Sequence, residues 1–99
     1  MYYAIFGTDS KDSLARRRAV REAHLANVAT LVEEGRVLLA GPHPAIDAED
    51  PGDAGFSGSL IVAEFESLEA ARAWAEADPY TREGVFSKVE VKPFKRVLP

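Results

Sequence analysis

The order in which two hydrophobic periods alternate along the chain is the feature that most narrows the choice of fold. Short runs rich in aromatic and β-branched residues, typical of strands, flank two longer segments whose apolar residues recur at helical spacing. The predicted strands span residues 2–8, 36–41, 58–65 and 85–93, and the predicted helices span residues 13–34 and 68–77. This βαββαβ order is the ferredoxin-like arrangement of the α+β class. We expect one domain over residues 1–99, with a four-stranded antiparallel sheet and two helices on one face.

Polar residues and glycine mark where the predicted helices begin and end. Asp12 or Ser13 can begin the first helix by accepting a hydrogen bond from an unpaired backbone N–H, and Gly35 suits the left-handed position after the last turn. Ser67 can cap the second helix in the same way. The strand at 58–65 is almost continuously apolar, which predicts a central position in the sheet.

One face of the predicted sheet has no helix to cover it. Successive residues of a strand point to opposite faces, so one of two sets of side chains from the first strand must lie there. The two sets are Tyr2, Ala4 and Phe6, or Tyr3 and Ile5. A second copy of the chain is the simplest cover for such a face, and we expect a homodimer formed through it.

Composition removes several classes of function. The 99 residues include no cysteine, which excludes disulfide frameworks, thiolate zinc sites, iron–sulfur clusters and cysteine nucleophiles. The net charge of −4 argues against a nucleic-acid partner. No segment approaches the ~20 apolar residues of a membrane span and no signal peptide is recognised, so we expect a cytoplasmic protein without a membrane partner. Two histidines without ligand spacing, and no phosphate-binding motif, predict neither a metal site nor a cofactor.

A histidine lies on the apolar side of the first predicted helix. At 100° per residue, His24 falls on the same face as several apolar side chains, so we expect its imidazole to point inward. These apolar neighbours are Val20, Val28, Leu31 and Val32, with Leu14 and Leu25 at the border of the face.

The topology predicts that this histidine meets an aspartate from the second helix. His24 lies roughly 18 Å along its helix and Asp78 roughly 16 Å along the neighbouring one, so the two side chains come level. An imidazole oriented by a carboxylate can serve as an acid–base pair. Two alternatives stay open: His24 is a hydrogen-bonded core residue, and Asp78 only caps the turn that begins at Pro79.

Other polar and aromatic residues near this position have two interpretations each. Arg17 and Arg21 precede His24 by two turns and one turn, and they could bind an anionic group of a substrate or be ordinary solvated helix charges. Trp74 has the spacing of a core residue. His43, between two prolines, is expected in a surface loop.

Short motifs over nearly the whole chain resemble the YciI family, the YCII-related proteins of bacteria. They are Asp12-Ser13-Leu14, Arg21, His24-Leu25, Glu34-Gly35-Arg36, Ala40-Gly41-Pro42, Asp50-Pro51-Gly52, Ala54-Gly55-Phe56, Gly58-Ser59, residues 63–71, Ala77-Asp78-Pro79-Tyr80, Gly84-Val85 and residues 91–95. The resemblance implies a dimeric α/β barrel in which two subunits pack sheet to sheet. It also implies an active site built on His24 and Asp78. Gly41, Pro42 and Tyr80 match other recurrent positions of the family, which implies that they line the pocket.

These residues support hypotheses of different classes. The first is a cofactor-independent enzyme of the isomerase or lyase type that acts on a small anionic or aromatic molecule, with His24 moving a proton and Asp78 orienting it. In a variant, His24 is a nucleophile that accepts a phosphoryl group. The second is a ligand-binding or regulatory dimer without turnover, and the third is a pair that only stabilises the fold. The resemblance supplies no reaction, and the fold alone cannot choose among these classes.

Overall fold

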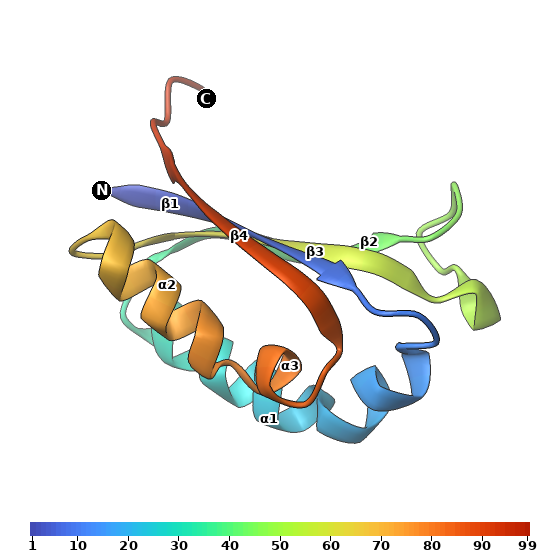
Figure 1. The fold of residues 1–99 in the computed structure, drawn as a ribbon. Coiled ribbons are helices and arrows are strands. Elements are labelled where there is room, and N and C mark those ends of the chain that lie inside the picture. The colour runs from blue at the N-terminus through green and yellow to red at the C-terminus, as the bar shows by residue number, and fades with distance from the viewer.

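The computed structural model describes all 99 residues and confirms the predicted βαββαβ order. In chain order the elements are β1 (Tyr2–Asp9), α1 (Leu14–Glu33), β2 (Val37–Pro44), a short 3-10 helix (Gly52–Ala54), β3 (Phe56–Glu64), α2 (Leu68–Ala77), α3 (Pro79–Arg82) and β4 (Phe86–Phe94). The strands form one antiparallel sheet in the order β2-β3-β1-β4, with β3 central as predicted. All helices lie on one face of the sheet (Figure 1). No helix has the length and apolar character that crossing a membrane would require.

The pairing of β1 with β3 decides which side chains face the helices. Tyr3 pairs with Ala63 and Ile5 with Ile61, and all four side chains are buried in the core. Val28, Leu31, Phe65, Ala71 and Ala75 complete this core. The helix-covered face therefore holds the second of the two predicted sets of β1 residues.

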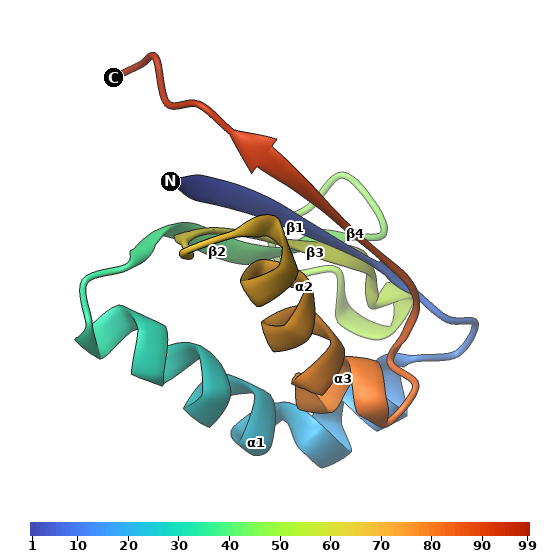
Figure 2. The ribbon, with the colours of Figure 1, turned by 60° about the vertical axis from the view of Figure 1, so that its left-hand side comes forward.

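The other face of the sheet is uncovered, as Figure 2 shows for the side opposite the helices. Tyr2, Ala4 and Phe6 alternate with the core residues of β1 and belong to this face. Large apolar side chains remain exposed on it, including Phe6 at 38% and Leu39 at 49%.

Two of the three expected helix ends agree with the structure and one does not. Gly35 has a φ of 70° just after α1, and Ser67 Oγ accepts a hydrogen bond of 3.1 Å from a backbone N–H of α2. Ser13 occupies the position before α1, but its hydroxyl donates to the Asp9 carboxylate and caps no N–H. The reason is that the Ser13 backbone is already helical, which turns the hydroxyl away from the first turn. Asp12 lies outside the helix with a φ of 57°.

The buried seam of α1 is narrower than its apolar stripe and includes a charged residue. His24, Val28 and Leu31 are buried as predicted. The prediction was wrong for Val32, which is 57% exposed, because it lies one residue round the helix from Leu31 and nothing packs there. Arg17 instead lies within the buried seam.

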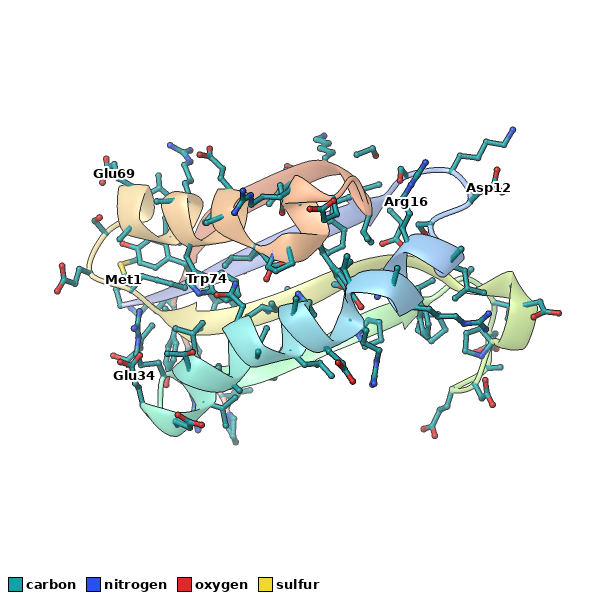
Figure 3. All side chains as sticks on the ribbon, turned by 90° about the horizontal axis from the view of Figure 1, so that it is seen from below. Met1, Asp12, Arg16, Glu34, Glu69 and Trp74 are labelled. Atoms are coloured by element: carbon teal, nitrogen blue, oxygen red, sulfur yellow. The ribbon has the colours of Figure 1, made fainter.

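Helix α2 packs against the core through an aromatic contact. Trp74 of α2 lies between α1 and α2 in the view of Figure 3, and its ring is 5.9 Å from that of Phe65. It is half-buried and packs against the core, in agreement with its predicted place. His43 is exposed as expected but belongs to β2, so the prediction of a loop there was wrong.

Candidate active site

The structure places the predicted histidine and aspartate in direct contact. The Nδ1 atom of His24 lies 2.8 Å from Oδ2 of Asp78, and the two residues are 8% and 2% exposed. His24 comes from the middle of α1, and Asp78 is the residue between α2 and α3. The rises along the two helices thus bring these groups level, as the spacing predicted.

The Asp78 carboxylate accepts three hydrogen bonds. Besides His24 Nδ1, it accepts one of 3.0 Å at Oδ2 from the Tyr80 backbone N–H and one of 2.8 Å at Oδ1 from the Asn27 side-chain amide. The bond from Tyr80 caps α3, so the capping role and the contact with His24 coexist. Sequence reasoning missed Asn27, although its position three residues after His24 puts it on the same side of α1.

These contacts determine which ring nitrogen of His24 carries a hydrogen. An ionised carboxylate only accepts hydrogen bonds, so Nδ1 must donate to Asp78. Nε2 has no hydrogen-bond partner within the chain. In this structure every polar side-chain atom that is fully buried has a partner, so an unpaired atom such as Nε2 is not fully buried. Nε2 is therefore accessible, and in the neutral ring its lone pair is free to accept a proton.

Tyr80 packs against the flat face of the His24 imidazole. Its ring stacks on the His24 imidazole with centroids 3.9 Å apart and planes within 3°, and the edge of Phe86 supports it at 5.6 Å. Burial raises the pKa of the Tyr80 phenol above its ordinary value, and the positive charges of Arg17 and Arg21 oppose this rise. The stack restricts rotation of the imidazole, which keeps Nε2 in one direction.

A cavity of about 210 Å³ opens beside His24, between α1 and strands β2 and β3. Its lining contains six of the seven site residues that the sequence selected, and the seventh, Asp78, lies behind the imidazole. The polar lining residues are Arg17, Arg21, His24, Ser59 and Tyr80, and the others are Leu25, Val28, Ala40, Gly41, Pro42 and Ile61. A small molecule in this cavity would therefore meet one histidine, two arginines and an apolar wall.

The two arginines differ in environment. Arg17 is not a solvated charge: it is 6% exposed, and its Nε and Nη2 atoms bind the two oxygens of Asp9 at 2.7 and 2.8 Å. Arg21 is exposed and forms no ion pair within the chain, so that its charge is available at the mouth of the cavity. Asp9 was missed in the sequence because it lies in a different element, β1.

The family model of the YCII-related domain matches residues 1–95 of the chain. The chain belongs to the YCII-related family. It is 60% identical over 98 residues to the protein YciI of Escherichia coli O6:H1, which covers 99% of this chain and 100% of that protein. An uncharacterised protein of Haemophilus influenzae is 55% identical over the same shares.

Among solved structures, this YCII-related chain is similar to a dehydrochlorinase. That protein is 5-chloro-2-hydroxyhydroquinone dehydrochlorinase from Burkholderia phenoliruptrix AC1100, in complex with 2,5-dihydroxybenzoquinone. The TM-score is 0.84 and the identity 28%, over 96% of this chain and 94% of that one. A monooxygenase-like protein of Nitrosomonas europaea shares the fold alone, at a TM-score of 0.54 and 16% identity.

The site of this YCII-related chain can move a proton. Its accessible ring nitrogen is fixed in tautomer by a buried carboxylate and faces a cavity that a small molecule can enter. No group of three or more His, Asp or Glu side chains is arranged to hold a metal ion.

Proposed function

We propose that this protein is a cofactor-independent enzyme of the isomerase or lyase type, with His24 as the acid–base group and Asp78 as its orienting partner. The observation that carries the proposal is the hydrogen bond from Nδ1 to Asp78, which leaves Nε2 as the reactive atom at the cavity. Asp78 also stabilises the positive charge that appears on the ring when Nε2 takes a proton.

Two outcomes are open to a substrate from which Nε2 removes a proton. In an isomerisation, the electron pair left behind shifts within the molecule and His24 returns the proton to a different atom. In an elimination, the electron pair forms a new double bond while a leaving group departs with its own bonding pair. Both balance without an oxidant or reductant.

Similarity to the dehydrochlorinase supports the elimination. That protein acts on a small hydroxylated ring, and its likeness to this chain covers nearly the whole fold. The cavity here suits a single ring of that size, since Val28, Ile61 and Pro42 offer apolar contacts and Arg17 and Arg21 supply positive charge for its oxygens.

Turnover of a chlorinated hydroxyhydroquinone tests the proposal directly. We expect the wild-type protein to release chloride from 5-chloro-2-hydroxyhydroquinone, or to exchange ring protons of 2,5-dihydroxybenzoquinone with D₂O, and we expect His24→Gln to lower either rate by about 10²-fold or more. His43→Gln is the matched control, since His43 is exposed on β2 and lies outside the cavity. If both ligands bind but neither reacts in the wild type, the protein is a ligand-binding module and the enzymatic proposal fails.

We further propose that a second copy of the chain covers the open face of the sheet. Phe6, Leu39 and Phe94 are 38%, 49% and 39% exposed there, an unusual group for one face of a small domain. Along β4 the same face presents Lys88, Glu90 and Lys92, whose alternating charges can pair with those of an identical strand.

Sedimentation velocity distinguishes this dimer from a monomer. Phe6→Lys should dissociate it, since the new charge lies at the centre of the open face. Val32→Lys adds the same charge at an exposed apolar position of α1 and should leave the dimer intact. A wild-type chain that stays monomeric at micromolar concentration would exclude this interface.

A further inference from the structure

The buried arginine of α1, Arg17, is not explained by a contribution to the stability of the fold. Arg17 has a side chain 8% exposed and is enclosed by the rings of Phe56, Tyr80 and Phe86, with its guanidinium carbon 5.0, 5.1 and 5.9 Å from their centroids. Its partner Asp9 is 3% exposed at the side chain, so both charges have been removed from water. Such a pair contributes little net stability compared with apolar residues of the same volume.

Counting the hydrogen bonds of Arg17 shows that part of its guanidinium is unused. Nε donates to Asp9, and the two hydrogens of Nη2 serve three acceptors, Asp9, the Gly58 carbonyl at 3.1 Å and Ser59 Oγ at 2.9 Å, so that one hydrogen is shared. Nη1 forms no well-aligned hydrogen bond within the chain, although the Arg17 side chain lies close enough to the Tyr80 phenol oxygen to lower the pKa of that group. Because no buried polar side-chain atom is unpaired, Nη1 must be accessible, and the Arg17 side chain lines both the cavity beside His24 and a neighbouring hollow next to Phe56.

Ser59 adds a second donor next to this nitrogen. It is 7% exposed, lies on the helix-facing side of β3 in step with Ile61, and lines the cavity. Its oxygen accepts from Arg17, while its hydroxyl hydrogen has no acceptor within the chain. The hydroxyl hydrogen is therefore free to donate into the cavity.

The two carboxylates near the cavity each accept three hydrogen bonds from the chain itself. Asp9 accepts from Arg17 and Ser13, and Asp78 accepts its three bonds at the other end. Apart from Nε2 of His24 and the Tyr80 phenol oxygen, the free polar side-chain groups that line the cavity are thus donors or positive charges. A cavity of this kind favours a negatively charged oxygen and offers one base.

We propose that Arg17 Nη1 and the Ser59 hydroxyl form an oxyanion-binding subsite, held in place by Asp9. The inference rests on the proposed function and specifies its substrate: a small planar anion, such as a phenolate, enolate or hydroxyquinone. The anionic oxygen binds Arg17 and Ser59 while the hydrogen to be moved faces His24. The base and the subsite belong to one cavity, since His24, Arg17 and Ser59 all line it.

Binding of a simple phenolate tests this subsite without any turnover. The probe is 4-nitrophenol near neutral pH, with 4-nitroanisole as a ligand of similar shape that cannot ionise, and both are followed by calorimetric titration. We expect the wild type to bind the phenolate about 10-fold or more tightly than the anisole, since hydrogen bonds to a charged oxygen are the strong ones. Ser59→Ala and Arg17→Lys should each remove about 10-fold of that preference, and Arg72→Ala, on the exposed side of α2, should remove none.

The outcomes separate the subsite from the proposed function. Ser59→Ala deletes one oxygen and is the variant least expected to disturb folding, so it decides the test if Arg17→Lys fails to fold. Equal affinity of the wild type for phenolate and anisole, or no effect of Ser59→Ala on phenolate binding, would refute the subsite even where His24 supports turnover. A phenolate preference that depends on Arg17 and Ser59 would establish it even if the wild type turns over nothing.

Discussion

Replacing Asp78 tests whether one carboxylate both caps α3 and orients His24. Asp78→Ala removes every acceptor at once. The loss of the cap costs about 1 kcal/mol, and the buried Nδ1–H of His24 then lacks a partner at about 1–3 kcal/mol. The Asn27 amide is only half-buried and can bind water instead. We therefore expect the free energy of unfolding to fall by about 2–4 kcal/mol in total.

Asp78→Asn is the informative comparison. Its amide oxygen can still accept from His24 and from the Tyr80 N–H, and Asn27 can turn its own amide to offer an oxygen to the new NH₂ group. All three contacts survive without the negative charge, so the expected loss is about 1 kcal/mol. Turnover should nevertheless fall, because the amide no longer stabilises a positive imidazole.

Urea denaturation at a fixed protein concentration measures the loss of unfolding free energy in Asp78→Ala and in Asp78→Asn, and thermal unfolding measures the corresponding fall in Tm. The single Trp74 reports unfolding through its contact with Phe65. At about 4–8 °C per kcal/mol for a domain of this size, Asp78→Ala should lower Tm by about 10–30 °C and Asp78→Asn by about 4–8 °C. Asp53→Ala, an exposed acid in the 3-10 helix, is the matched control and should change little. Equal losses for the Ala and Asn variants, or a loss under about 1 kcal/mol for Ala, would refute the assignment of these hydrogen bonds.

Three further expectations concern other contacts. Arg17→Met leaves the buried Asp9 carboxylate without its positively charged partner and should cost about 3–5 kcal/mol in urea denaturation, of which adding Asp9→Asn should recover a part. Burial raises the pKa of Tyr80, so the stability that its protonated phenol contributes is fully present below about pH 10 and is lost as the pH rises through the raised pKa. In Tyr80→Phe this alkaline loss should be smaller when unfolding is compared between about pH 8 and about pH 11. Gly35→Ala should lower stability by about 1 kcal/mol from its φ of 70° alone, because nothing lies within 4 Å of the added methyl group; an unchanged stability would contradict the left-handed helix end.

The proton-transfer pair requires fewer elements of the fold than the anion subsite does. His24 and Asp78 sit on adjoining helical segments, so helix geometry is enough to bring them level. The subsite needs β1 for Asp9, α1 for Arg17 and β3 for Ser59, three elements that meet only when the sheet has formed. Substitutions in the sheet should therefore disturb anion binding before they disturb the histidine–aspartate contact.

The sequence alone determined those features that depend on local period and local caps. The two hydrophobic periods set the βαββαβ order, the 100° rotation per residue turned His24 inward, and Ser67 and Asp78 capped the segments that follow them. Each of these requires only neighbours a few residues apart, or the rise of one helix. For that reason no knowledge of packing was needed.

Two features depend on how the elements pack: which side of a helix is covered by others, and which polar side chain has a hydrogen-bond partner. Val32 has the right period for the core but lies outside the seam that the other elements cover, while Arg17 lies within it because Asp9 neutralises its charge from another strand. Periodicity describes one element at a time, whereas burial of a charge depends on a partner in a different element, as Asp9 of β1 is for Arg17 of α1. The register between β1 and β3, which sets the positions of Asp9 and Ser59, is a long-range pairing that local pattern does not specify.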